Sequence, residues 1–284
     1  MSSRLIRSIA LIAVAGVVAS ATAQAQDRKS CERDYKPQVG QSGKDVVWVP
    51  TPDELVQRML RMAKVTPQDI VYDLGAGDGK IAIAAGKAGA TAVGIEYNPD
   101  MAKLAQCYVQ ADGVGNKVKI IQGDIFKEDF SKATVITMYL LPELNLRLRP
   151  TILNMKPGTR VTSHQFTMGD WEPDETAEIE YRTAYLWIVP AKVEGAWTLR
   201  EQGGSGQYTV NLNQKYQKIS GDIASGSAKQ PLVGATLRGD EIRFAFNDDK
   251  GVTRTLTGTV RGNEITGVLK GAGGAETKVT GSRK

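Results

Sequence analysis

The sequence predicts an α/β domain, built on a parallel sheet with helices on both faces, followed by a small all-β domain. Three observations carry this prediction. Strand and helix patterns alternate up to about Pro190, which is the order of a parallel sheet with covering helices. A glycine-rich turn, "GAGDG", follows the first of these strands. After about Ala191 the chain changes to short alternating strands separated by glycine, which is typical of a β-meander or barrel.

The first 25 residues predict a secretory signal peptide. Arg4 and Arg7 precede an apolar run over residues 9–18, and small residues lead up to Ala25. The apolar run is shorter than the about 20 residues that a membrane span needs. We therefore expect cleavage and export, to the periplasm in a bacterium. Retention of the segment as a membrane anchor is the alternative.

The rest of the chain divides into three parts by composition. Residues 26–45 are polar, contain Gly and Ser, and are expected to be a linker. Residues 46–190 carry the strand–helix alternation of a Rossmann-like domain, and residues 191–284 form the β domain. No run of five or more basic residues marks a nucleic-acid-binding tail.

The elements of the α/β domain follow in order. Amphipathic periodicity predicts a helix over residues 53–63. A second helix is expected over residues 80–88, and a third begins at Pro99 with Asn98 as its N-cap. The parallel strands are expected in "DIVYDLG", "TAVGIEY", "KVKIIQGD", "ATVITMYLL" and "RVTSHQF". The alternation in "AEIEYRTAYLWIVP" predicts an antiparallel pair at the sheet edge.

Two hairpins of the β domain are indicated by their turns. "LRGDEIRF" and "VRGNEITG" place Gly-Asp and Gly-Asn between alternating strands, and such pairs favour tight hairpin turns. The Arg-Gly-Asp sequence at residues 238–240 is therefore interpreted as a turn and not as an adhesion motif.

The glycine loop falls at the carboxyl edge of the predicted sheet, where ligands bind in such folds. A dinucleotide site needs the spacing G-x-G-x-x-G. Here Gly75, Gly77 and Gly79 are evenly spaced and Lys80 follows them. The dinucleotide fingerprint is therefore absent.

Acidic residues flank the same loop. Asp73 and Asp78 would repel a pyrophosphate by on the order of several kcal/mol in a partly desolvated site, whereas they favour a cationic ligand. S-adenosylmethionine carries an ammonium and a sulfonium on a nucleoside without phosphates, so it fits this arrangement. Glu96, which ends the second strand, can accept from both ribose hydroxyls. Asp124, which follows the third strand, can accept from the adenine amino group.

A metal site is not expected. The chain has two cysteines, Cys31 and Cys107, and one histidine, His164, without the spacing of a zinc site. In an exported protein the two cysteines could form one disulfide, but Cys31 lies in a polar segment and Cys107 in a predicted helix. The sequence leaves their pairing open. His164 ends a core strand and is interpreted as a structural residue.

Several motifs resemble those of a known enzyme family. "DLGAGDG", "GIEYNP" and "QGDIF" resemble the successive motifs of class I, seven-stranded S-adenosylmethionine-dependent methyltransferases. More narrowly, "VPTPDELVQRML", "TMYLLPELNLRLRP" and "KPGTRVTSHQFTMGDW" are similar to bacterial relatives of the mitochondrial lysine methyltransferases that modify the ATP synthase c subunit. The resemblance covers residues 48–174 and hardly touches the β domain.

The resemblance implies roles for two groups of residues. The first group would bind the methionine part, the ribose and the adenine of the cofactor: Thr51, Pro52, Asp73, Gly75, Ala76, Gly77, Glu96, Asp124 and Ile125. The second group follows the fourth strand and would form the lip that receives the methyl acceptor: Tyr139, Leu140, Pro142 and Asn145. Methyl transfer from an activated sulfonium depends mainly on positioning, so no catalytic acid is expected.

The sequence therefore predicts an S-adenosylmethionine-dependent methyltransferase that N-methylates a protein lysine. Two alternatives stay open: methyl transfer to a small molecule or lipid, and an exported non-catalytic nucleoside-binding protein whose β domain binds a partner. Export would take the protein away from the cytoplasm, where the cofactor is made. A membrane-tethered enzyme that faces the cytoplasm is therefore a further alternative. No nucleic acid partner is expected, and the β domain is expected to contribute nothing to the cofactor pocket.

Overall fold

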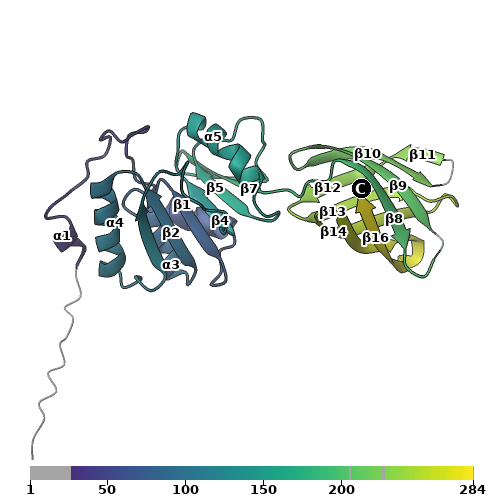
Figure 1. Ribbon diagram of the computed structural model, residues 1–284, viewed down its shortest axis with the longest axis horizontal. Coiled ribbons are helices and arrows are strands. Elements are labelled where there is room, and N and C mark those ends of the chain that lie inside the picture. Colours follow the sequence, from purple (N-terminus) through teal and green to yellow (C-terminus); the bar gives the residue numbers. More distant parts are fainter. Residues whose placement is uncertain (1–26, 205, 226–227, 284) are drawn as a thin grey trace, which may run out of the picture.

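The computed structural model describes residues 27–204, 206–225 and 228–283, and the predicted signal peptide lies outside these residues. Two sheets, each with its own core, lie side by side along the long axis of the molecule (Figure 1). The last strand of the first sheet ends at Ile188 and the first strand of the second begins at Gly195. Within the described part of the chain, no helix is long and apolar enough to cross a membrane.

The first sheet has seven strands in the order β3-β2-β1-β4-β5-β7-β6. Its first five strands pair in parallel, whereas β7 pairs antiparallel with both β5 and β6. This arrangement confirms the predicted parallel sheet with an antiparallel pair at its edge. The strands are β1 (Ile70–Leu74), β2 (Thr91–Glu96), β3 (Val118–Gln122), β4 (Val135–Met138), β5 (Arg160–His164), β6 (Glu175–Ile179) and β7 (Arg182–Ile188).

Helices cover both faces of this sheet and divide its core in two. On one face lie α2 (Asp53–Met62), α3 (Lys80–Lys87) and α4 (Pro99–Ala111), and α5 (Pro142–Leu153) packs on the other. Successive strand residues point to opposite faces, so Val135 packs with the first set of helices and Ile136 packs with α5. Both faces are therefore buried, as in other parallel sheets with crossover helices.

The segment predicted as a linker, residues 26–45, is instead folded against the α/β domain over its described part. Helix α1 (Arg28–Cys31) lies against α4, and a disulfide joins Cys31 to Cys107 with 5.7 Å between their Cα atoms. The Arg28 guanidinium also donates to both carboxylate oxygens of Asp112, at 2.7 and 2.9 Å. The sequence left the pairing of these two cysteines open. The structure shows that they form a disulfide, which anchors the start of the described chain.

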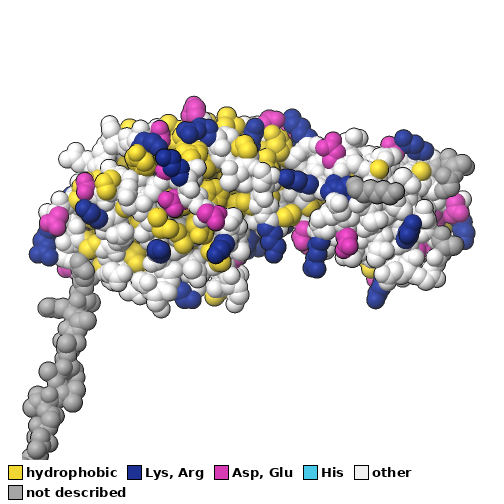
Figure 2. Space-filling view, in the orientation of Figure 1, with side chains coloured by type: hydrophobic (Ala, Val, Ile, Leu, Met, Phe, Trp, Pro, Cys, Tyr) yellow, Lys and Arg dark blue, Asp and Glu magenta, His cyan; other side chains and the backbone are white. Residues whose placement is uncertain are grey.

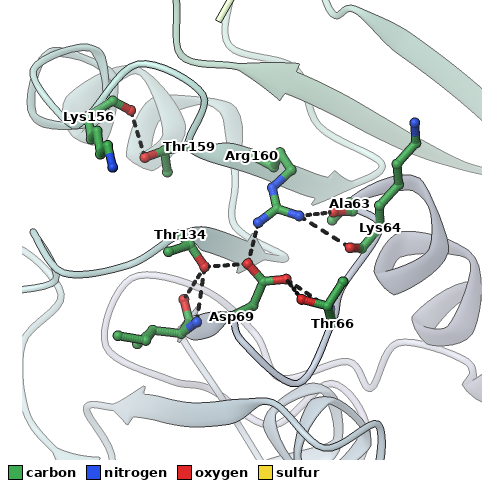
Figure 3. A network of polar contacts seen from close by, with 9 residues as sticks. Ala63, Lys64, Thr66, Asp69, Thr134, Lys156, Thr159 and Arg160 are labelled. Atoms are coloured by element: carbon green, nitrogen blue, oxygen red, sulfur yellow. Dashed lines mark hydrogen bonds and ion pairs between the residues drawn. The ribbon is translucent and has the colours of Figure 1, made fainter. Parts of the chain in front are cut away.

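A polar network fixes the amino ends of three neighbouring strands (Figure 3). One carboxylate oxygen of Asp69 accepts from Thr134 at 2.7 Å and from Arg160, while the other accepts from the Thr66 backbone N–H at 2.8 Å. Arg160 also donates to the carbonyl of Ala63 at 2.7 Å. Burial by itself raises the pKa of Asp69, but these hydrogen bonds and the Arg160 charge outweigh burial and hold the pKa below its ordinary value. The network ties the starts of β1, β4 and β5 to the end of α2.

The second sheet has nine antiparallel strands in the order β11-β10-β9-β8-β16-β15-β14-β13-β12. Contacts between β10 and β12 bring its ends together into a nearly closed barrel filled by apolar side chains. Its elements are β8 (Gly195–Glu201), β9 (Gln207–Lys215), β10 (Lys218–Ser225), β11 (Ala228–Pro231), β12 (Val233–Arg238), β13 (Glu241–Asn247), β14 (Thr253–Arg261), β15 (Glu264–Lys270), the 3-10 helix η1 (Ala272–Gly274) and β16 (Glu276–Arg283).

The predicted hairpin turns of the β domain are confirmed. Gly239 connects β12 to β13 and Gly262 connects β14 to β15, both with positive φ. The first of these turns has a second role, because Gly239 lies against Gly158 of the α/β domain and its carbonyl accepts from the Ala191 N–H at 2.7 Å. The Arg-Gly-Asp sequence therefore forms a turn at the contact between the domains.

Asp69→Asn should destabilise the α/β domain by on the order of 3 kcal/mol, because it leaves the largely buried Arg160 guanidinium without a counter-charge. Thermal unfolding followed by circular dichroism should show a lower melting temperature. The exposed Asp249 in the β13–β14 loop provides the control, since Asp249→Asn breaks no buried pair. A melting temperature of Asp69→Asn equal to that of the control would contradict the role of the network.

Candidate cofactor and acceptor site

A cavity of about 550 Å³ opens at the carboxyl edge of the parallel sheet. Its size lies within the range of small-molecule sites. All of its lining residues fall between Gln41 and Phe166, so the β domain contributes none of them. The loops that follow β1, β2, β3 and β4 meet here because parallel strands place their carboxyl ends at one edge.

The glycine loop after β1 forms the floor of the cavity by close backbone approach. Gly75 and Gly77 have φ values of +79° and +56°, which side chains disfavour. A Cβ atom at Gly75 would lie 2.9 Å from the Leu140 side chain, and one at Gly77 would lie 2.8 Å from the Trp48 indole nitrogen. The backbone conformation therefore favours glycine at both positions, and a larger residue would also displace Leu140 or Trp48.

Asp73 stands at the end of β1 in an unusual environment. Its side chain is buried; Oδ1 accepts from the Thr137 hydroxyl at 2.7 Å, whereas Oδ2 is buried with no partner among the described residues. Burial raises the pKa of Asp73 to about 7, and the carboxylates of Asp78 and Glu96 add to the rise. A buried acceptor without a donor is costly, so Asp73 is suited to receive a cationic donor from a ligand in the cavity.

Glu96 and Asp124 are held by backbone donors. The Glu96 carboxylate accepts from the N–H groups of Gly77 and Asn98, both at 2.8 Å, so it ties the glycine loop to the end of β2. Asp124 accepts from the Phe126 N–H at 3.0 Å, and this bond and the Lys44 ion pair lower its pKa. Both carboxylates keep further lone pairs that can accept from ligand hydroxyl or amino groups.

An N-terminal hairpin, residues 40–48, closes one side of the cavity. The Trp48 N–H donates to the Gln41 carbonyl at 2.9 Å, and an isolated bridge pairs Ser42 with Val47. From the turn of this hairpin, Lys44 reaches Asp124 at 3.0 Å. The hairpin follows the disulfide-anchored segment directly, so the anchor lies close in sequence to the cavity wall.

Part of the cavity lining is aromatic and apolar. Tyr139 and Phe166 form it, with ring centroids 6.0 Å apart, together with Leu140. His164 lies behind Tyr139 at 3.8 Å between ring centroids, and its Nδ1 is 3.1 Å from the Thr51 hydroxyl. Burial lowers the pKa of His164 to about 4, so the ring is neutral at pH 7. His164 therefore supports the wall, in keeping with its structural interpretation.

The structure brings most of the residues predicted for the site to the cavity and leaves three outside its lining. The residues that line it are Thr51, Asp73, Gly75, Ala76, Gly77, Glu96, Asp124, Ile125, Tyr139 and Leu140. Those that do not are Pro52, Pro142 and Asn145. Asn145 is fully buried and donates to the Thr167 carbonyl at 3.1 Å, so it holds a loop behind the wall and does not face the cavity.

Parts of the lining are not predicted by the sequence. Most of the N-terminal hairpin falls in the polar segment expected to be a linker, and Phe166 lies within the motif "KPGTRVTSHQFTMGDW" but is not predicted as a site residue. The available signal for the hairpin was the apolar run Val46, Val47 and Trp48 that follows an otherwise polar stretch, and all three residues line the cavity. Among residues 27–204, 206–225 and 228–283, no group of three His, Cys, Asp or Glu side chains is placed to hold a metal ion.

Comparison with known proteins places this site in a family. Residues 73–175 match the ANTKMT methyltransferase domain. A protein-lysine N-methyltransferase of Saccharolobus islandicus (strain REY15A) is 43% identical over 151 residues, which are 51% of this chain and 94% of that protein. The chain belongs to the ANTKMT methyltransferase family. It is an S-adenosylmethionine-dependent methyltransferase.

Two further relatives extend the comparison of this methyltransferase. The lysine N-methyltransferase of the ATP synthase c subunit from Rattus norvegicus is 30% identical over 145 residues, 51% of this chain and 67% of that protein. An RNA methyltransferase from Salinibacter ruber, solved with S-adenosyl-L-homocysteine, is 48% identical with a TM-score of 0.50, and the match covers 51% of this chain and 96% of that one. These matches cover about half of the chain.

The residues of this methyltransferase fit the cofactor. The unpartnered Asp73 Oδ2 is suited to the ammonium of its methionine part, and Gly75 and Gly77 let Leu140 and Trp48 pack closely against the loop that lines the cavity. Glu96 has free acceptor capacity for two ribose hydroxyls, and Asp124 has the same for an adenine amino group. Asp73, Glu96 and Asp124 therefore each have a complementary group on S-adenosylmethionine.

Cofactor affinity should rise with pH as Asp73 ionises, because an ammonium is stabilised only by the charged carboxylate. Below the pKa of about 7, the association constant should increase by up to about tenfold per pH unit, and the rise should level off above it. Calorimetric titration with S-adenosylhomocysteine between pH 5.5 and 7.5 measures this dependence. Asp73→Asn should bind more weakly and without the slope; an equally flat profile for the unsubstituted protein would contradict the assignment.

Proposed function

We propose that this enzyme N-methylates a lysine side chain of a protein. Its relatives in Saccharolobus islandicus and Rattus norvegicus are named as lysine N-methyltransferases, and the first is 43% identical over nearly its whole length. The sequence motifs within residues 48–174 support the same acceptor.

The observation that carries the proposal is the mixed character of the cavity lining. The cavity is lined both by carboxylates and by Tyr139, Leu140 and Phe166, and we assign the carboxylates to the cofactor end and these three side chains to the acceptor end. An apolar wall suits the aliphatic stem of lysine, and desolvation there lowers the pKa of the lysine amine. The amine must be neutral to act as a nucleophile, so this wall favours its reactive form.

The enzyme residues have few chemical tasks. S-adenosylmethionine, when bound, supplies a methyl group that its sulfonium already activates. Asp73, Glu96 and the glycine loop hold the cofactor end, and Tyr139 and Leu140 orient the acceptor and exclude water, so rate enhancement comes mainly from positioning. The neighbour of Tyr139, His164, is neutral because burial lowers its pKa to about 4.

An RNA acceptor is the second candidate, because the Salinibacter ruber relative is named an RNA methyltransferase. Five acidic and two basic side chains line the cavity, and the two bases, Lys44 and Lys80, are paired with Asp124 and Asp53. Binding of an RNA backbone depends on unpaired Lys and Arg side chains. The charge of the lining therefore favours a protein acceptor.

Purified protein given S-adenosylmethionine with a labelled methyl group should transfer the label to the protein fraction of a cell-envelope extract. After acid hydrolysis, mass spectrometry should find the label on methylated lysine. Asp73→Asn is the matched control, since it preserves shape but removes the cofactor's ionic partner. Label recovered in RNA, lipid or small molecules, and not in protein, would overturn the lysine proposal.

We further propose that the protein is exported and acts in an oxidising compartment, with a retained membrane anchor as the alternative arrangement. The signal-peptide pattern of residues 1–25 motivates this proposal. The Cys31–Cys107 disulfide supports it, because disulfides persist in secreted and periplasmic proteins and are rare in the cytosol.

The redox state of the cysteines in cells tests the export proposal. After acid quenching, a maleimide polymer should leave the protein unshifted on a gel until a reductant is added, and should then shift it by two additions. Cys31→Ser, which frees one thiol, marks the position of a single addition. Two additions without reductant would show that the protein stays in a reducing compartment.

A further inference from the structure

The β domain touches the α/β domain through a turn that carries an unexpected residue. Tyr216 and Gln217 connect β9 to β10, and we call this pair the docking turn. In two other hairpins of the same domain, Gly239 and Gly262 take the corresponding first position, with φ of 61° and 59°. Tyr216 has a φ of 55°, a left-handed conformation that bulky side chains rarely adopt. The turn therefore keeps a tyrosine where glycine would be unstrained.

The Tyr216 side chain belongs to the core of the other domain. Its ring packs against the apolar cluster beneath α5, and its centroid lies 6.0 Å from that of the buried Trp171. Its hydroxyl donates to Asp170 Oδ1 at 2.9 Å. Strained residues persist where the surrounding structure holds them, and they concentrate at functional positions.

The rest of the docking turn and its two flanking lysines bind the same segment. Gln217 donates to the Glu172 carbonyl at 2.6 Å, Lys218 pairs with the Glu172 carboxylate at 2.6 Å, and Lys215 pairs with Asp170 at 3.3 Å. Four consecutive residues of the β domain therefore contact residues 170–172 of the α/β domain. The Tyr216 hydrogen bond is the first cause of the fall in the pKa of Asp170 to about 2, so the carboxylate is charged at neutral pH.

The contacted segment continues directly into the wall of the cavity. Phe166 lines the acceptor end, and we call residues 165–168 the acceptor loop. One nitrogen of Arg149, Nη1, donates both to the Met168 carbonyl of this loop and to Asp170, each at 2.7 Å. Asn145 holds the loop from α5 through the Thr167 carbonyl. Arg149 thus couples the docked Asp170 to the loop that carries Phe166.

We propose that Tyr216 is a positioning residue for methyl transfer, holding the acceptor loop and Phe166 in place from the β domain. The inference rests on the proposed acceptor end of the cavity. The β domain thereby acts on the acceptor side of the reaction while contributing no lining residue. Binding of the cofactor should be unaffected, since none of the contacts of the docking turn involves Asp73, Glu96 or Asp124.

Tyr216→Gly tests the proposal, because glycine relieves the backbone conformation of the turn and removes only the contacts of the side chain. Tyr181→Gly is the matched control: Tyr181 has a φ of 65° in the β6–β7 turn, and its side chain is fully exposed. Tyr216→Phe keeps the ring and removes only the bond to Asp170.

Hydrogen exchange of the full chain gives a result that does not depend on an acceptor. Tyr216→Gly should speed exchange over residues 164–172, acceptor loop included, by about fivefold or more, with a smaller effect in Tyr216→Phe and none in Tyr181→Gly. Faster exchange confined to residues 170–172, or no change, would overturn the proposal, since the turn would then only join the domains.

Label transfer from S-adenosylmethionine to envelope-extract protein gives the second result. In Tyr216→Gly, the extract concentration that half-saturates transfer should rise by about fivefold, while the cofactor dissociation constant stays within about twofold of the unsubstituted value. An unchanged half-saturating concentration would also overturn the proposal. Absence of transfer by the unsubstituted protein would refute the proposed function alone, because hydrogen exchange still decides the role of Tyr216.

Discussion

The parallel pairing of β1 with β2 on one side and β4 on the other is the constraint on which the site depends. Paired in register, Leu74 lies beside Ile95 and Met138, so three strands end together at one edge of the sheet. Loops of different length can then converge on one ligand. The Asp69 network holds the starts of β1, β4 and β5 in the same alignment at the opposite edge.

The carboxylates that line the cavity lie in two kinds of environment. Glu96 and Asp124 accept from backbone N–H groups, and these bonds offset the loss of water around them. Asp73 lacks this compensation at one oxygen, and burial raises its pKa to about 7. Its ionised form is therefore costly until a cationic ligand arrives. Backbone donors therefore hold the carboxylates of Glu96 and Asp124 in place before a ligand binds, whereas the carboxylate of Asp73 needs a cationic ligand to stabilise its charge.

Elements outside the parallel sheet complete the cavity. The N-terminal hairpin forms part of the lining and is held to the α/β domain by the Lys44–Asp124 ion pair, while the Cys31–Cys107 disulfide anchors the chain before it. The β domain supports the acceptor end through its docking turn. Figure 2 shows apolar side chains gathered over the α/β domain, while the visible face of the β domain is mainly polar. The α/β domain, which holds the cavity, is therefore the more apolar part of this surface.

The order of strands and helices along the chain, the cofactor class and most of the residues predicted to line the cavity could be inferred from the sequence. This was possible because Asp73, Gly75 and Glu96 lie at strand ends and in a local loop, where chemical type and spacing along the chain decide their position. The pairing of Cys31 with Cys107 and the docking of Tyr216 could be seen only in the folded structure. Those contacts join segments distant in sequence, and their geometry depends on how helices and domains pack, which no local periodicity encodes.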